Sequence, residues 1–146
     1  MIEKPKYSFC LENKKNSLII SVLKYSIPDA DSNWDKNWLE GEISVDVGGF
    51  KGYCKAEFMT RDFDNFKNQL ERLYKKLKGT ANFNTIDDQI GIRMVGDGLG
   101  HITSHCLIMD QVGIGNTLEC EIKLDQTMIP IILNQLESIL YRFPVV

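Results

Sequence analysis

Two histidines are the first residues in this sequence that could support catalysis. His101 and His105 are four residues apart, with Asp97 before them and Asp110 after them. A histidine beside a carboxylate can act as a general acid or base, and the same groups can bind zinc. On one strand, however, the two histidines would lie about 13 Å apart, too far to bind one ion together. With no nucleophile motif and no H-E-x-x-H, we expect no enzyme, no catalytic residue, no metal and no cofactor.

Four cysteines are the other residues with reactive side chains: Cys10, Cys54, Cys106 and Cys120. No two of them have the close spacing of a zinc knuckle or a C-x-x-C motif. We expect free, buried thiols that pack as small apolar side chains. A disulfide is not expected in a protein of the cytosol.

The segment 27–37 is the longest without hydrophobic periodicity, and it contains three aspartates and a tryptophan: Asp29, Asp31, Trp34 and Asp35. Acidic loops are usually only solvated, and a tryptophan beside a strand often closes one end of a core. A long acidic loop with an aromatic anchor is also typical of a partner-binding surface. A calcium loop is excluded, because Trp34 stands where such loops need glycine. The candidate surface is therefore this segment together with Glu40.

After that loop, the sequence predicts a β-hairpin that is followed directly by a helix. Gly48-Gly49 is a two-residue turn signal, and it sets the register of the two flanking strands. The inward pairs are then Val47 with Phe50, Val45 with Gly52, Ile43 with Cys54, Gly41 with Ala56 and Leu39 with Phe58. The outward pairs are Asp46 with Lys51, Ser44 with Tyr53 and Glu42 with Lys55. All inward pairs are apolar or small, so this face should be buried.

Two apolar stripes with helical spacing predict amphipathic helices at about 61–78 and 128–142. The remaining alternating segments predict strands. We therefore expect an α+β fold, in which a mainly antiparallel sheet of about seven strands packs against the two helices. At this length the chain is expected to form one domain, residues 1–146.

The hairpin-helix unit resembles the C-terminal segment when the chain is aligned with itself at an offset of 66. Cys54 falls on Cys120, and Asn68-Gln69-Leu70-Glu71 falls on Asn134-Gln135-Leu136-Glu137. Two explanations stay open. One is an internal ββα duplication, and the other is the periodicity that any strand-helix pair shares.

Charge and hydropathy indicate the compartment and the kind of partner. The net charge of −3 argues against a nucleic-acid binder and permits a basic partner. The N-terminus shows no signal peptide, and no apolar run is long enough to span a membrane. We expect a cytoplasmic protein that contacts neither nucleic acid nor membrane.

Several short motifs occur in an order that is similar to a known family. They are Asp35-Lys36-Asn37-Trp38-Leu39, Gly48-Gly49-Phe50, the helix positions Phe66, Leu70, Leu73, Leu77 and Gly79, then Gly100-His101, Asp110 and Asp125-Gln126-Thr127. From Leu18 to Leu140 the chain resembles the WapI-type immunity proteins, small bacterial proteins encoded beside polymorphic toxins.

The resemblance implies an inhibitor that binds the C-terminal domain of a toxin, often a nuclease, and blocks it. Our candidate contact residues are Asp29, Asp31, Trp34, Asp35 and Glu40, of which the four acids would attract a basic toxin domain and the tryptophan would anchor it. The run Asp29-Ala30-Asp31 is not matched by the family, so its role rests on loop length and charge alone. The alternative is a non-catalytic cytosolic binding or scaffold domain with an unknown ligand.

Overall fold

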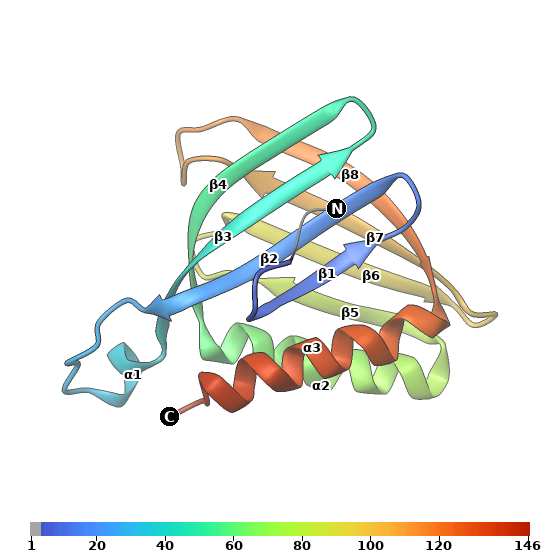
Figure 1. The fold of residues 1–146 in the computed structure, drawn as a ribbon. Helices are drawn as coiled ribbons and strands as arrows, with labels where there is room; N and C mark the ends of the chain where they lie inside the picture. The colour runs from blue at the N-terminus through green and yellow to red at the C-terminus, as the bar shows by residue number, and fades with distance from the viewer. Residues whose placement is uncertain (1–3) are drawn as a thin grey trace.

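Eight strands form two separate antiparallel sheets in the computed structural model, which describes residues 4–146 (Figure 1). The first sheet has the order β1 (Ser8–Glu12), β2 (Asn16–Tyr25), β3 (Trp38–Val47) and β4 (Phe50–Met59). The second has the order β5 (Lys78–Asn84), β6 (Ile90–Asp97), β7 (His101–Met109) and β8 (Thr117–Asp125). The α+β class is confirmed, but one sheet of about seven strands was wrong. Helix α2 (Thr60–Lys76) lies between β4 and β5, so these two strands do not form a hairpin, and β5 begins the second sheet.

The helices are α1 (Asn33–Lys36), α2 (Thr60–Lys76) and α3 (Ile129–Arg142), with a 3₁₀ turn η1 (Gln126–Met128) before α3. The two predicted helices are confirmed within two residues at each end, and α1 was not predicted. Helix α2 starts after Met59, whose N–H donates to the Asp62 carboxylate at 2.8 Å. It ends at Leu77, which takes a left-handed φ of 58° and donates its N–H to the Leu73 carbonyl.

The register of the central hairpin is as predicted for all eight pairs that the Gly48-Gly49 turn implied. Gly48 has a φ of 57°, which is the conformation that makes glycine the favoured residue in such a turn. The inward residues farther from the turn are buried, including Ile43, Leu39 and Phe58. Close to the turn, the expectation of a buried face was wrong for β4: Phe50 faces inward in register but is 67% exposed, Gly52 is exposed and Cys54 is half-buried.

Both long helices lie across one end of the two sheets, where α3 packs on β1 and α2 packs on β5 (Figure 1). The Gln135 side-chain oxygen accepts the backbone N–H of Cys10 in β1 at 3.0 Å. The Gln69 oxygen accepts the N–H of Asn82 in β5 at 2.9 Å. These are the edge strands at this end, so each helix supplies hydrogen bonds that an edge otherwise lacks. The β4 and β8 edges lie on the side away from the helices.

The element order of four strands and a helix therefore occurs twice, and the helix of each half covers the first strand of the other half. Residues paired by the offset of 66 are buried in both helices: Phe63 and Ile129, Phe66 and Ile132, Leu70 and Leu136, Leu73 and Ile139. Gln69 and Gln135, which the offset also pairs, each accept a backbone N–H from the edge strand that their helix covers. A common origin of the two halves stays a prediction, but the shared residues have a structural reason.

The core fills the space between the sheets and the helices. Its centre is a group of five phenylalanine rings with centroids 5.2 to 6.1 Å apart: Phe9, Phe58, Phe63, Phe66 and Phe83. All five side chains are fully buried. Because these rings come from β1, β4, α2 and β5, they join the two halves through one apolar contact.

Candidate functional site

The predicted acidic segment is an exposed loop between β2 and β3, and it carries α1 (Figure 1). Asp29, Asp31 and Trp34 are exposed, and Asp35 is half-buried. The Ser32 side chain caps α1 by accepting the Asp35 N–H at 3.1 Å. The structure thus brings four of the five candidate residues together on one short, locally ordered segment.

The loop is fixed at its base by Asn37, a fully buried amide. The Asn37 side-chain oxygen accepts the Thr60 hydroxyl at 2.5 Å and the N–H of Val146 at 2.9 Å. The amide nitrogen of Asn37 donates to the Asn33 carbonyl at 2.7 Å. One side chain therefore joins α1, the start of α2 and Val146 beyond α3.

Trp34 is 50% exposed, so half of its surface remains available for contact. The Arg61 guanidinium carbon lies 5.8 Å from the centroid of its ring. A cation at this distance from an indole face attracts it, which favours one orientation of the side chain. Trp34 is thus a partly oriented aromatic group beside exposed carboxylates.

Glu40 lies apart from the loop, on the outer face of the first sheet. Its carboxylate is 3.7 Å from the Lys24 ammonium group. It lines a hollow together with Lys24, Lys55 and Glu57, and within residues 4–146 the loop aspartates do not line that hollow. If Glu40 contacts the partner, it does so from a neighbouring surface.

Both histidines lie on β7 with exposed side chains, and each has its own carboxylate. His101 Nδ1 is 2.7 Å from Asp97, and His105 Nδ1 is 3.2 Å from Glu121. The N–H of Leu99 and the His101 ring hold the pKa of Asp97 below its usual value. Within the described residues, no three His, Cys, Asp or Glu side chains come close enough to hold a metal ion.

The four cysteines are free thiols in the structure. Cys10 and Cys106 are buried, as predicted, and burial raises the pKa of Cys10 to about 12. Cys54 and Cys120 are only half-buried, and Cys120 stands directly opposite Cys106 in the β7–β8 ladder. Cys54 lies at the end of the molecule that the helices do not cover, where it lines an open cleft.

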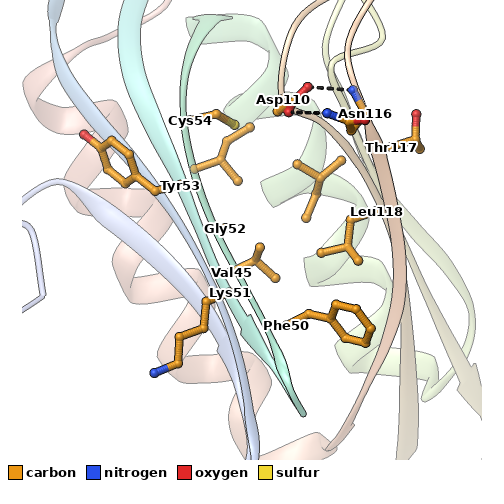
Figure 2. Close-up of a pocket in the computed structure, with 12 residues that line it drawn as sticks. Val45, Phe50, Lys51, Gly52, Tyr53, Cys54, Asp110, Asn116, Thr117 and Leu118 are labelled. Atoms are coloured by element: carbon orange, nitrogen blue, oxygen red, sulfur yellow. Dashed lines mark hydrogen bonds between the residues drawn. The ribbon is translucent and has the colours of Figure 1, made fainter.

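An apolar cleft at that open end is a surface that the sequence analysis missed (Figure 2). It has a volume of about 340 Å³ and lies between β4 and the β7–β8 hairpin. Figure 2 shows Val45, Phe50 and Leu118 pointing into it, while Lys51 points away. At its rim, the Asp110 carboxylate accepts the N–H and the side-chain amide of Asn116 at 2.7 and 3.1 Å.

One signal in the sequence could have indicated this cleft. The inward positions Gly52 and Cys54 of β4 are small, although they face the larger Val45 and Ile43 of β3. Small side chains on an inward face leave space that some other group must fill, or that stays open. Nothing in the rest of the described chain fills it, because Phe50 stays 67% exposed.

No described helix has the length and apolarity needed to cross a bilayer. A sequence profile of the immunity protein WapI-like family matches residues 9–144 of the chain. No curated protein matches the sequence. Among solved structures, that of the plant transcriptional regulator PBF-2 aligns over 94% of this chain and 80% of its own, with a TM-score of 0.49 and 9% sequence identity.

Proposed function

The chain belongs to the immunity protein WapI-like family, and from this membership we propose that it binds and neutralises a cognate toxin domain by direct protein–protein contact. It would act in the cytoplasm as a single domain and without catalysing a reaction. The toxin domain is proposed to be basic, as a nuclease that grips nucleic acid would be. The family match over residues 9–144 is the observation that carries this proposal.

The proposed contact surface is the loop between β2 and β3, with Asp29, Asp31, Trp34 and Asp35, and it extends to Glu40. Its exposed carboxylates would draw a basic partner by long-range attraction. The anchored base and the capped α1 reduce the entropy that the loop would lose on binding. Trp34 supplies the kind of aromatic side chain that dominates binding energy at interfaces.

The test is a binding titration with the C-terminal domain of the toxin encoded beside this gene. Wild-type chain should bind it tightly and in one-to-one stoichiometry. Reversing the charges of Asp29, Asp31 and Asp35 to lysine should weaken binding about tenfold or more at low salt. The remaining affinity should also depend less on salt, because fewer charges attract the partner.

Glu137→Lys, on the exposed face of α3, changes the net charge by as much as a single loop reversal, and it is therefore the control for Asp31→Lys. We expect it to change affinity and salt dependence only slightly. If the triple reversal leaves both unchanged, the loop is not the contact surface. If no toxin domain from the neighbouring genes binds, the chain is better described as a binding module for a different ligand.

A further inference from the structure

The edge of β8 is open over the first half of the strand. β8 is the last strand of its sheet and has β7 as its only ladder partner within the described residues. The first-strand edges at the other end are covered by helices, as the glutamine contacts to β1 and β5 show. An uncovered edge exposes backbone donors and acceptors that another strand can pair with.

Two hydrogen bonds tell which β8 residues face this open edge. The Lys123 carbonyl accepts the Asn13 side-chain amide at 3.0 Å, so the backbone groups of Lys123 point away from β7. The Met109 N–H, opposite Thr117, donates to the Gln89 carbonyl instead of to β8. Because this direction alternates along a strand, the backbone groups of Thr117, Glu119 and Glu121 all face outward. Within residues 4–146 these groups have no hydrogen-bond partner.

Hollows border the same stretch of β8. The apolar cleft lies against its start, at Thr117 and Leu118 (Figure 2). A second hollow of about 440 Å³ lies on the outer face of the β7–β8 ladder, against Glu119 and Glu121 of β8 and the paired Leu107 and His105 of β7. Leu118 and Cys120 face the interior and are only half-buried, so apolar side chains of an added strand could cover them.

The charge of this edge defines the strand that would fit it. Glu119 and Glu121 are exposed on the outer face of β8, so basic residues opposite them would be favoured. The other open edge, β4, carries Lys51 and Lys55, and the Gln89 side chain already occupies the Lys55 carbonyl at 2.8 Å. Pairing β8 with β8 of a second copy would bring acidic residues together. The β8 edge is therefore the one that suits a basic protein partner.

We propose that the free edge of β8, from Thr117 to Glu121, pairs with an extended segment of the partner protein in which basic and apolar side chains alternate. The basic side chains would lie beside Glu119 and Glu121. The apolar side chains would enter the cleft beside Leu118 and Phe50. The inference rests on the proposed function only in taking the partner to be a basic protein.

The test uses two cyclic hairpin peptides and the full chain, followed by amide NMR. One peptide has an outer strand that alternates lysine with valine, and the other has glutamate in place of lysine. With the lysine peptide, the amides of Thr117, Glu119 and Glu121 should shift and exchange about tenfold more slowly or slower still. The glutamate peptide should bind about tenfold more weakly.

Glu119→Pro tests how much backbone hydrogen bonding along the β8 edge contributes to peptide binding, apart from the side-chain charge. Its N–H faces the open edge, so proline removes a donor for the added strand and leaves the β7–β8 ladder intact. We expect binding of the lysine peptide to be lost, whereas Glu119→Gln should weaken it only a few-fold. Tyr53→Pro is the matched control at the open edge of β4, and it should bind like wild type. Thermal unfolding of each variant would confirm that the fold persists.

With the peptides, three results would overturn the inference: no binding of the lysine peptide, protection of β4 amides instead of β8 amides, or sedimentation showing self-association that Glu119→Pro abolishes. Peptide binding without binding of any toxin domain would reject the proposed function and keep the β8 site. Toxin binding that leaves the β8 amides unprotected would keep the proposed function and reject the β8 site.

Discussion

The two halves of this molecule have the same element order and differ in their connections. The link between β2 and β3 is the long loop with α1, whereas β6 and β7 are joined by a short turn around Leu99. Conversely, β3 and β4 meet in a two-residue turn, whereas β7 and β8 are joined by residues 110–116. Each half forms its four-stranded sheet whether a given pair of strands is joined by a long loop or by a short turn. The loop with α1 is therefore not required by the architecture, which leaves its exposed acids available for recognition.

The largest loss of stability is expected from substitutions at buried positions that are equivalent in the two halves. Phe66 and Ile132 occupy equivalent, fully buried positions in α2 and α3. Phe66→Ala should lower the free energy of unfolding by about 3 to 5 kcal/mol and Ile132→Ala by about 2 to 5 kcal/mol, because a cavity replaces packed atoms. Denaturant titration checks this. A loss below 1 kcal/mol at either site would show that the two stripes are not equivalent parts of the core.

A pH effect should distinguish the halves. Asp62 in α2 falls on Met128 in the offset of 66, so only the first half carries an acid there. Burial raises the pKa of Asp62 to about 6, above the unfolded value of 3.8. The folded state thus holds this proton more tightly, and its stability contribution rises as pH falls from about 6 to 4.

Asp62→Asn keeps an acceptor for the Met59 N–H and removes the titration. Its stability gain over wild type should therefore be roughly 2 to 3 kcal/mol larger at pH 7 than at pH 4. Urea titrations of both proteins at the two pH values measure this difference. Equal gains at both pH values would show that Asp62 titrates normally.

Gln69 and Gln135 give the sharpest test of equivalence, because their roles match. Replacing either with leucine should cost about 1 to 2 kcal/mol, since a backbone N–H on a strand edge loses its acceptor. The amides of Asn82 and Cys10, respectively, should exchange faster. Costs that differ by more than about 1 kcal/mol would mean that one edge is covered in another way.

The smallest effect on stability is expected in the loop. Asp31→Lys should change the free energy of unfolding by less than about 0.5 kcal/mol, because the side chain is exposed. Its effect should appear in toxin binding instead. A large loss of stability would make Asp31 part of the scaffold and weaken the contrast between the halves.

Local patterns were predicted well because they are encoded locally. The Gly48-Gly49 turn determines the hairpin register, and the apolar stripes determine α2 and α3. The division into two sheets could not be predicted, because strand alternation shows faces and not which strands are neighbours. Alternation also placed Phe50 inward, but whether an inward position is covered depends on the distant β7–β8 hairpin. The candidate loop was found from length and charge, while its anchor at Asn37 depends on Val146, 109 residues away.

The exchange of helices between the halves has a consequence for the order in which the protein can fold during synthesis. The edge of β1 is covered by α3, which leaves the ribosome only after all eight described strands. The first sheet would therefore expose its apolar face and an unpaired edge until α3 has emerged. We expect stalled nascent chains that end before residue 129 to bind chaperones and to be cut readily by protease, and full-length chains to resist both.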